Sequence, residues 1–381
     1  MALSACTSVP PVRVEPAPPQ PSPMPAPPPA AKALPRLQLA SFTDIVGWRS
    51  DDLREAWKPF LASCEVLNRK PEWRNTCNAA LAVDAGNASA IRTFFETYFL
   101  PHRVINADNS EVGLVTGYYE PLLRGARKRG GPYQVPLFRV PEDMLVVDLS
   151  AAYPELKGMR LRGRLAGNRV LPYPTRAEIA QSNTLAGKEL LWVDNAIDAF
   201  FLEVQGSGRV ELADTKETVR VAYADQNGHA YRSIGRYLVD KGEMTLDQAN
   251  ADSIKAWFIA NPARRQELLN ANPSVVFFRE EKLAPPFPGP KGALGVPLTA
   301  GRSIAVDPST VPLGAPVFLA TTQPNSALPL QRLMMAQDTG GAIRGGVRAD
   351  FFWGFGKQAG ELAGRMKQQG AMWVLLPRPQ S

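Results

Sequence analysis

The first folded part of the chain has apolar residues at helical spacing. Ser50, Asp51 and Asp52 offer N-caps just before a run in which apolar side chains recur every three or four positions. The apolar members of this run are Leu53, Trp57, Phe60, Leu61, Cys64 and Leu67. A second helix is predicted over residues 73–83. A third is predicted after Asn87, with an aromatic stripe that we interpret as a packing face.

From residue 113 the pattern changes to short strands separated by Gly and Pro. The predicted strands are residues 113–123, 133–140, 144–149, 159–164, 190–193, 199–205, 210–212, 219–224, 274–279, 303–306, 317–320, 333–337 and 372–376. Helices are predicted over residues 175–181, 233–241, 246–260, 263–270 and 357–369. Short strands with few long helices between them favour β-barrels over a doubly wound sheet. The predicted fold class is therefore mainly β with flanking helices.

The N-terminal residues follow a different pattern. Leu-Ser-Ala-Cys at residues 3–6 matches the box of bacterial lipoproteins in which the cysteine, here Cys6, is acylated. The alternative is a chance tetrapeptide. Residues 7–36 are rich in proline, since twelve of the 36 prolines lie between Pro10 and Pro35. Such a segment favours extended polyproline II and reaches on the order of 90 Å at about 3.1 Å per residue. It is typical of a tether between a membrane and a globular domain.

Composition and net charge favour some classes of binding partner over others but do not identify a single one. The formal net charge of +7 suits an acidic polymer, whether nucleic acid, anionic lipid or the carboxylates of peptidoglycan. The basic residues lack the interleaved aromatic pattern of an RNA-binding sheet. No apolar stretch reaches the roughly 18 residues that indicate a transmembrane helix.

The cysteines and histidines do not suggest a metal site. Cys64 and Cys77 are expected to form a disulfide in an exported chain, which stabilises the fold by roughly 3 kcal/mol. Two free buried thiols are the alternative. His102 and His229 have no ligand spacing with cysteine or carboxylate, so we expect no metal and no cofactor.

Three aspartates in the last third of the chain are the main candidates for chemistry. The sequence has no G-x-S-x-G elbow, Cys/His pair or phosphate-binding loop. Asp307, Asp338 and Asp350 each follow an apolar or small run, where we expect a strand to end and a side chain to face a groove. A carboxyl group is what acid/base chemistry on a glycosidic oxygen requires. Turn formation is the alternative for Asp307 and Asp338, whereas no turn sequence directly follows Asp350.

A second candidate cluster is Thr-Gly-Tyr-Tyr-Glu-Pro at residues 116–121. Adjacent tyrosines on a strand point to opposite faces, so Tyr118 and Tyr119 cannot both face one groove. One of them could stack on a sugar ring while the other packs. The alternative is that both tyrosines belong to the packing of a barrel.

Together these motifs resemble the MltA family of lytic murein transglycosylases. The three aspartates lie in Ala-Val-Asp-Pro, Gln-Asp-Thr-Gly-Gly-Ala-Ile and Arg-Ala-Asp, which resemble the C-terminal three-aspartate (3D) domain of that family. Residues 116–121, 201–208 and 228–235 resemble its other motifs, in the same order. The similarity extends from about residue 48 to residue 376.

The resemblance implies a fold of two barrels. The first is a double-psi β-barrel formed by residues 37–121 and 283–381, with N-terminal helices. The second is a smaller β-barrel inserted at residues 122–282, and a groove lies where the two meet. The Pro- and Gly-rich residues 283–295 then become the return crossing, after an acylation site at residues 1–6 and a tether at residues 7–36.

The resemblance also implies a reaction and its residues. The family cleaves the β-1,4 bond between N-acetylmuramic acid and N-acetylglucosamine without water and leaves a 1,6-anhydromuramoyl end. Its catalytic aspartate corresponds to Asp350, while Asp338 and Asp307 become supporting acids. Substrate-binding residues carried over from the motifs are Thr116, Tyr118, Tyr119, Gln205, Gly206, Ser207, Tyr231, Arg232, Thr339, Gly340 and Gly341.

The expected partners are peptidoglycan glycan strands and, through the lipid on Cys6 alone, a membrane. We expect no nucleic acid, and a cell-wall synthesis complex is a further candidate partner. Thr7 follows the cysteine where an aspartate would retain the protein at the inner membrane, so the expected location is the periplasmic face of the outer membrane. The alternatives are a peptidoglycan hydrolase on the same barrel and a non-catalytic wall-binding barrel.

Overall fold

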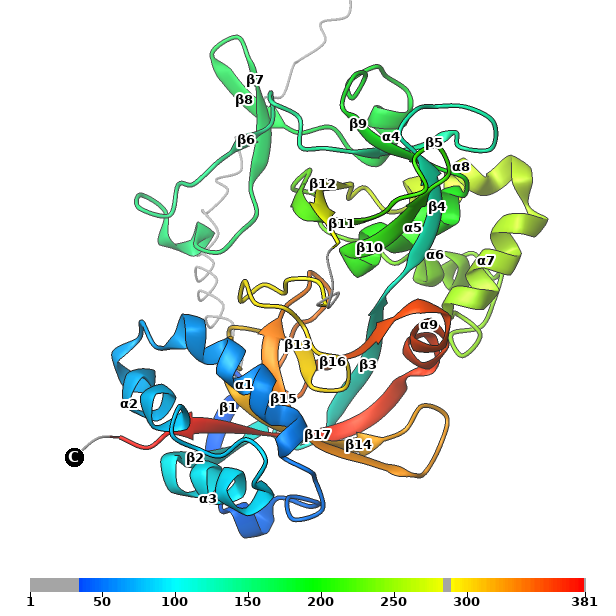
Figure 1. Ribbon diagram of the computed structural model, residues 1–381. Coiled ribbons are helices and arrows are strands. Elements are labelled where there is room, and N and C mark those ends of the chain that lie inside the picture. The colour runs from blue at the N-terminus through cyan, green and yellow to red at the C-terminus, as the bar shows by residue number, and fades with distance from the viewer. Residues whose placement is uncertain (1–33, 284–288, 380–381) are drawn as a thin grey trace, which may run out of the picture. The chain divides into compact units, whose positions relative to one another are not determined.

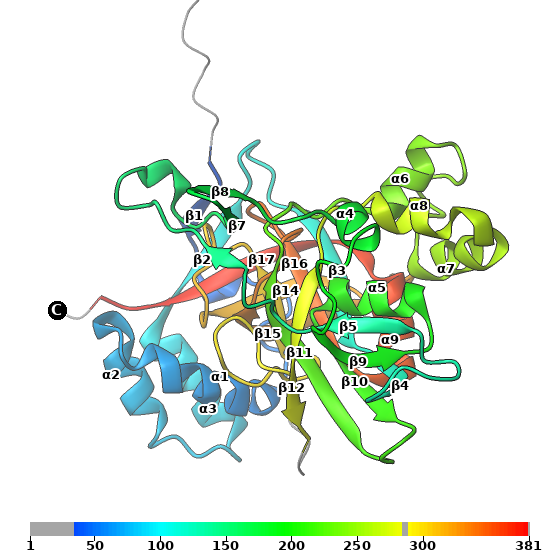
Figure 2. The same ribbon diagram turned by 90° about the horizontal axis from the view of Figure 1, so that it is seen from above.

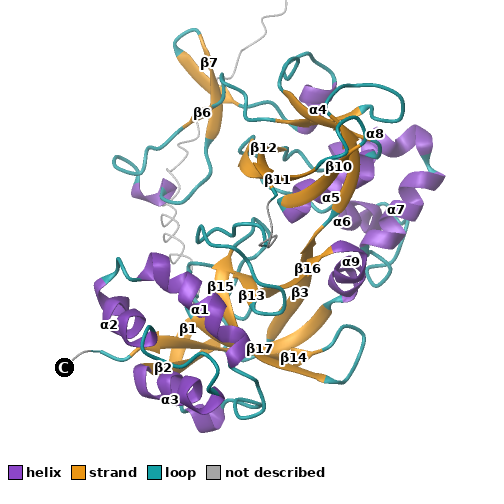
Figure 3. Cartoon of the chain, viewed as in Figure 1, coloured by secondary structure: helices purple, strands orange, loops and turns teal. Residues whose placement is uncertain are grey.

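The computed structural model describes residues 34–283 and 289–379. Cys6 and nearly all of the predicted tether at residues 7–36 lie outside the described residues, as does part of the predicted crossing at residues 283–295. Within the described residues, no helix is long and apolar enough to cross a membrane. Strands predominate and helices flank them (Figure 3), so the predicted fold class is confirmed.

The three predicted N-terminal helices are present as α1 (Arg54–Leu67), α2 (Pro71–Ala80) and α3 (Ala88–Tyr98). Asn87 caps α3 by accepting from the backbone N–H groups of Ser89 and Ala90. The aromatic stripe packs as expected, because Phe94 and Phe95 belong to the largest apolar cluster. A disulfide joins Cys64 of α1 to Cys77 of α2, whose Cα atoms are 5.4 Å apart.

Six strands form a closed barrel beside these helices (Figure 1). They follow the order β17-β14-β15-β13-β16-β3, and β3 pairs again with β17, so the hydrogen bonds run around a ring. The strands are β3 (Gly113–Glu120), β13 (Ser303–Val306), β14 (Pro316–Thr322), β15 (Pro329–Asp338), β16 (Ala349–Phe355) and β17 (Lys367–Pro377). Two more strands, β1 (Arg36–Leu39) and β2 (Phe99–Ile105), extend the sheet from β17.

A second sheet has six strands in the order β12-β11-β10-β4-β9-β5. These strands are β4 (Leu122–Ala126), β5 (Val135–Phe138), β9 (Glu189–Val193), β10 (Ser207–Leu212), β11 (Thr218–Gln226) and β12 (Val276–Lys282). All six contribute to one apolar cluster, in which Leu137 of β5 and Phe278 of β12 come from opposite ends of the order. This arrangement is barrel-like, although no ring of strand pairs closes it within the described residues.

Smaller elements complete the insert. A three-stranded sheet contains β6 (Leu145–Val146), β7 (Arg162–Ala166) and β8 (Arg169–Pro172). The helices are α4 (Arg176–Ala180), α5 (Ala196–Gln205), α6 (Ile234–Asp240), α7 (Ala251–Ala260) and α8 (Arg265–Asn270). Helix α5 lies along the six-stranded sheet (Figure 2). Helices α6 to α8 pack against the side of α5 that faces away from this sheet, through a separate apolar cluster.

The prediction of a strand at residues 199–205 is wrong, because these residues belong to α5. Ala199 and Leu202 pack into the core of the six-stranded sheet, whereas Phe200 packs among α6, α7 and α8. A helix that is buried on two sides loses the periodicity that separates a helix from a strand. Gly206, with φ of +79°, ends α5 in the left-handed conformation that favours glycine.

Other boundaries also differ from the predictions. The predicted helix at residues 357–369 ends earlier, as α9 (Gly356–Arg365), because residues 367–370 pair with residues 113–116 and close the barrel. Helix α7 begins at Ala251 rather than at residue 246. Asp51 does not cap α1 but forms a buried ion pair with Arg302, at 2.7 and 2.8 Å. Tertiary contacts decide the end of α9 and the role of Asp51, whereas the start of α7 is set locally by Asn250, which caps the helix by accepting from the N–H of Ser253.

The two sheets are joined by a buried ion cluster where β3 leads into β4. Glu120, the last residue of β3, accepts from Arg209 of β10 at 2.9 Å and from Arg220 of β11. The side chain of Glu120 is 1% exposed, so its charge is compensated by these guanidinium groups rather than by water. Arg209 also lies over the ring of Phe355 at the end of β16, 3.7 Å from the ring centroid.

We predict that Glu120→Gln lowers the free energy of unfolding by about 3–5 kcal/mol, because it removes the buried negative charge that faces two arginine side chains. Urea unfolding measures this change. Asp240→Asn is the matched control, since Asp240 pairs with Arg236 on the surface, where a lost pair costs about 0.5 kcal/mol or less. Equal losses in the two variants would contradict the prediction.

Candidate active site

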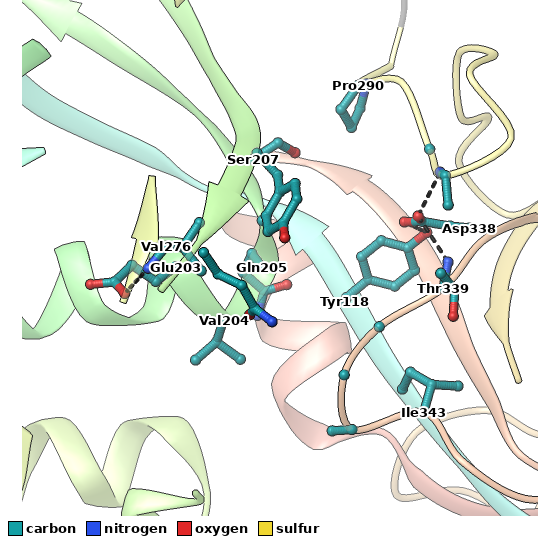
Figure 4. Close-up of a pocket in the computed structure, with 18 of the residues that line it drawn as sticks. Tyr118, Glu203, Val204, Gln205, Ser207, Val276, Pro290, Asp338, Thr339 and Ile343 are labelled. Atoms are coloured by element: carbon teal, nitrogen blue, oxygen red, sulfur yellow. Dashed lines mark hydrogen bonds between the residues drawn. The ribbon is translucent and has the colours of Figure 1, made fainter. Parts of the chain in front are cut away.

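A cavity of about 530 Å³ lies between the open end of the barrel and the six-stranded sheet. In Figure 4, Gln205, Ser207 and Val276 come from one side, Asp338, Thr339 and Ile343 come from the other, and Tyr118 lies between them. The predicted site residues that line the cavity are Tyr118, Gln205, Gly206, Ser207, Tyr231, Asp338, Thr339, Gly340, Gly341 and Asp350. Segments far apart in the sequence therefore meet at one pocket.

Asp350 is half-buried in the wall of this cavity. It is the second residue of β16, so the expectation that it follows the end of a strand is wrong. In the parallel pairing of β16 with β3, Asp350 lies opposite Thr116, whose hydroxyl donates to Asp350 Oδ1 at 2.7 Å. Burial raises the pKa of Asp350, and the Thr116 hydrogen bond and the charge of Arg348 offset only part of that effect.

The Thr116 hydroxyl is oriented by Arg348. Arg348 Nη2 donates to Thr116 Oγ1 at 3.0 Å, and a guanidinium group can only donate. The hydroxyl hydrogen of Thr116 is therefore free to point at Asp350 Oδ1. Within the described residues no hydrogen bond is formed by Asp350 Oδ2. A proton on this carboxyl is thus favoured on Oδ2, because Oδ1 already accepts a hydrogen bond.

Asp338, the last residue of β15, is held by three donors. Its Oδ1 accepts from the backbone N–H groups of Ala293 and Thr339, both at 2.9 Å, and its Oδ2 accepts from the Tyr118 hydroxyl at 3.0 Å. Burial, together with the charge of the nearby Asp350, raises the pKa of Asp338 to about 6 against the effect of these three donors. The carboxyl groups of Asp338 and Asp350 are therefore both protonated more readily than exposed aspartates.

Two family models match most of the described chain. The model of the MltA specific insert domain matches residues 114–279, and that of the 3D domain matches residues 302–376. The membrane-bound lytic murein transglycosylase A of Escherichia coli strain K12 is 36% identical over 281 residues, which are 72% of this chain and 68% of that protein. The chain belongs to the MltA family.

Solved structures of lytic transglycosylases resemble most of the chain. The lytic transglycosylase LtgG of Burkholderia pseudomallei is 49% identical, with a TM-score of 0.59; the match covers 90% of this chain and 96% of that chain. Escherichia coli MltA with bound chitohexaose is 29% identical, with a TM-score of 0.69 and coverage of 90% and 95%. The resemblance read from the motifs is confirmed.

Asp307 lies beside the pocket of this MltA-family chain rather than in its lining. It follows β13, and its carboxylate accepts from the hydroxyl and N–H of Ser309 and from the N–H of Gly345. Burial raises the pKa of Asp307, but these donors outweigh burial and the pKa is lowered overall. Asp307 is therefore ionised, and it fastens the loop that connects Asp338 to Asp350.

The two tyrosines of β3 point to opposite faces, as expected, and Tyr118 is the one that faces the pocket. Its ring packs against Phe352 and its hydroxyl is bound to Asp338, so it supports the site more than it offers a free stacking face. Tyr119 packs against α9, where a Cβ at Gly360 would approach its ring within 2.8 Å. The backbone N–H of Tyr119 donates to Gln205 Oε1 at 3.1 Å.

Some predicted residues lie away from the pocket, and some lining residues were not predicted. Thr116 lies behind Asp350, and the side chain of Arg232 is exposed outside the lining. Lining residues that no motif indicated include Arg160, Tyr223, Arg279, Lys291 and Ala293. Tyr223 and Arg279 lie within β11 and β12, and the other three lie in loops. None stands in a chemical motif, so only the tertiary structure brings them to the site. No group of three metal-ligating side chains occurs among the described residues.

Proposed function

We propose that Asp350 is the single acid and base of a peptidoglycan lytic transglycosylase. The chain is a lytic murein transglycosylase of the MltA family. This membership identifies the substrate as peptidoglycan and the reaction as lytic transglycosylation. The observation that carries the assignment of Asp350 is its geometry: one oxygen is held by Thr116, and the second is left open within the described part of the pocket. The raised pKa of Asp350 agrees with this role.

The reaction needs one proton to move in each direction. Protonated Asp350 donates from Oδ2 to the glycosidic oxygen, the bond from that oxygen to C1 of the muramic acid breaks, and N-acetylglucosamine leaves with a new 4-hydroxyl. The C6 hydroxyl of the same muramic acid then bonds to C1 and gives its proton to the Asp350 carboxylate. The product is the 1,6-anhydro sugar, Asp350 is protonated again, and no water is consumed. Because the attack is intramolecular, much of its entropy cost is already met.

The arrangement of Asp338 favours this reaction over hydrolysis with two carboxylates. A retaining or inverting hydrolase needs a second carboxylate that is free to attack C1 or to activate water. Both oxygens of Asp338 are instead occupied by hydrogen-bond donors. We therefore assign Asp338 a positioning role, in which it joins Tyr118 to the loop that carries Ala293 and Thr339.

A non-catalytic binding barrel is disfavoured by the same geometry. Such a protein has no need for a half-buried carboxyl group whose pKa is raised. Burying it costs free energy, and an amide would bind sugar hydroxyls equally well. The raised pKa is what a general acid requires near neutral pH.

Asp350→Asn should reduce the release of anhydromuropeptides from sacculi by at least about 100-fold, because the amide cannot donate and accept the proton. Mass spectrometry of the digest measures the product, and thermal unfolding checks that the fold is kept. Asp240→Asn, on the exposed surface, is the control. Retention of more than a few per cent of the wild-type activity would refute the role of Asp350, and reducing ends in the wild-type digest would instead identify a hydrolase.

Thr116→Val should move the alkaline limb of the kcat profile to higher pH. The Thr116 hydrogen bond lowers the pKa of Asp350, so its loss raises that pKa and keeps the acid protonated at higher pH. We also expect kcat at the optimum to fall about 10-fold, because the carboxylate formed in the reaction loses a donor. Thr116→Ser keeps the hydroxyl and should retain the wild-type limb. A shift to lower pH in the valine variant, or equal shifts in both, would contradict this role.

We also propose that the protein is anchored to the outer membrane through a lipid on Cys6. The sequence at residues 3–6 and Thr7 at the following position support this location, and the curated Escherichia coli relative is named as membrane-bound. A lipoprotein carries several acyl chains, which is enough for stable anchoring. The proline-rich residues 7–36 would then allow the pocket to reach glycan strands away from the bilayer.

Cys6→Ser should release the protein into the soluble periplasmic fraction while activity on isolated sacculi stays within about 2-fold of wild type. The lipid acts on location, whereas the pocket lies more than 100 residues further along the chain. Membrane fractionation and the digest assay measure the two properties separately. Persistence of the variant in the membrane fraction would show that the anchor is not at Cys6.

A further inference from the structure

We propose that Arg160 and Arg279, on the sheet side of the pocket, bind carboxylates of the peptide attached to the muramic acid. This inference rests on the proposed function and adds to it the part of the substrate that is not sugar. It makes the enzyme selective for glycan strands that still carry their peptides.

The two arginines are gathered around one tyrosine of the pocket wall. Arg160 lies over the ring of Tyr223, with its guanidinium carbon 5.8 Å from the ring centroid. Arg279 donates through Nη1 to the backbone carbonyl of Tyr223. All three residues line the cavity, and Arg279 is opposite Ala222 in the pairing of β11 with β12. The wall therefore presents two guanidinium groups that both contact Tyr223.

The position of Arg160 is fixed by the residues that follow it. Arg162, two positions later, donates through Nε to both carboxylate oxygens of Asp225, at 3.0 and 2.9 Å. Gly228 packs so closely there that a Cβ would lie 2.9 Å from the Cβ of Arg162. The segment that carries Arg160 is thereby fastened to the end of β11, so Arg160 belongs to a built wall.

The positive charge of this wall is not cancelled from within the pocket. Across residues 34–283 and 289–379, the guanidinium group of Arg160 forms no hydrogen bond or ion pair. The same is true of the ammonium group of Lys291, which lines the cavity from the opposite loop. Arg279 shares the carboxylate of Glu281, at 2.9 and 3.1 Å, but its side chain remains 50% exposed. An arginine guanidinium stays protonated at any physiological pH, so these charges are permanent.

The acids of the pocket are already engaged. Glu203 is held by two hydrogen bonds from Arg176, at 3.0 and 2.7 Å, and by the N–H of Val276. Asp338 is held by three hydrogen-bond donors, and Asp350 is the proposed acid of the reaction. The free charge that a ligand meets on the sheet side is therefore positive.

The chemistry of the substrate matches this division of the pocket. Sugar hydroxyls and acetamido groups are neutral, and neutral partners such as Gln205, Ser207 and backbone amides are sufficient for them. The peptide on muramic acid carries carboxylates, for which the planar fork of arginine offers paired, charge-assisted hydrogen bonds. The neutral groups thus bind the sugars of the glycan strand, and the two arginines bind the carboxylates of its peptide.

The test compares glycan strands that carry their peptides with the same strands after carbodiimide coupling to ammonia has converted the peptide carboxylates to neutral amides. For the wild type we expect a higher kcat/KM on the strands whose peptides keep their carboxylates, and we expect salt to reduce this preference because it screens charge. In Arg160→Gln/Arg279→Gln the ratio of the two kcat/KM values should fall at least 10-fold, mainly through KM. Arg169→Gln, an exposed arginine of β8 outside the pocket lining, should keep the wild-type ratio.

An unchanged ratio in the double variant, or the same loss in the Arg169→Gln control, would overturn the inference. The single variant Arg160→Gln repeats the test with a side chain whose removal breaks no hydrogen bond within the described chain, in case the double variant is unstable. Failure of the proposed function is distinguishable from failure of the inference. If the wild type releases no anhydro ends, equilibrium binding of Asp350→Asn to the two kinds of strand still measures the preference.

Discussion

The buried carboxylate of Glu120 is the interaction on which the pocket depends. It lies where the chain leaves the barrel for the six-stranded sheet, and it meets Arg209 and Arg220 of two strands of that sheet. A carboxylate that is 1% exposed is stable only while those guanidinium groups stay in place. The ion cluster therefore ties the end of β3 to β10 and β11, and the cavity is lined from both sheets.

The same strand then distributes its side chains by the simple alternation of a β-strand. Thr116, Tyr118 and Glu120 are two residues apart and so point to one face of β3. The first donates to Asp350, the second donates to Asp338, and the third binds the arginines of the neighbouring sheet. One strand thus orients the proposed acid, fixes its neighbouring acid and joins the two sheets. A shift of its register by one residue would lose all three contacts together.

The sequence allowed prediction of those parts of the fold in which a periodic pattern coincides with local capping. Helix α3 is an example, because Asn87 and the aromatic stripe act within a few residues of one another. Helix α5 was missed as a helix, since burial on two sides leaves it without a polar face. The start of β17 was missed because its first residues pair with β3, about 250 positions earlier in the chain.

The same distinction applies to the candidate site, in which some residues could be predicted from the sequence and others could not. Asp338 and Asp350 stand in motifs that can be read from the sequence, although Asp350 is near the start of a strand and not after its end. Arg160 and Arg279 stand in no motif and reach the pocket only through the pairing of β11 with β12 and through the ion pair of Arg162 with Asp225. Residues that perform chemistry carry a local signature, whereas residues that shape the pocket are placed by tertiary contacts.

The position of Arg348 shows how the pKa of an acid can be raised although a cation lies nearby. A guanidinium group in direct contact with a carboxylate lowers the pKa of that carboxylate by about 1–3 units. Such contact would oppose the effect of burial and favour the carboxylate form of Asp350, which cannot donate a proton. Arg348 instead reaches Asp350 through the Thr116 hydroxyl, and its other hydrogen bonds go to backbone carbonyls, so burial prevails and the pKa of Asp350 is raised. When the proton leaves for the glycosidic oxygen, the same cation stabilises the new carboxylate. Through the Thr116 hydroxyl, Arg348 can stabilise the carboxylate that forms in the reaction. It lowers the pKa of the starting acid less than a direct contact would.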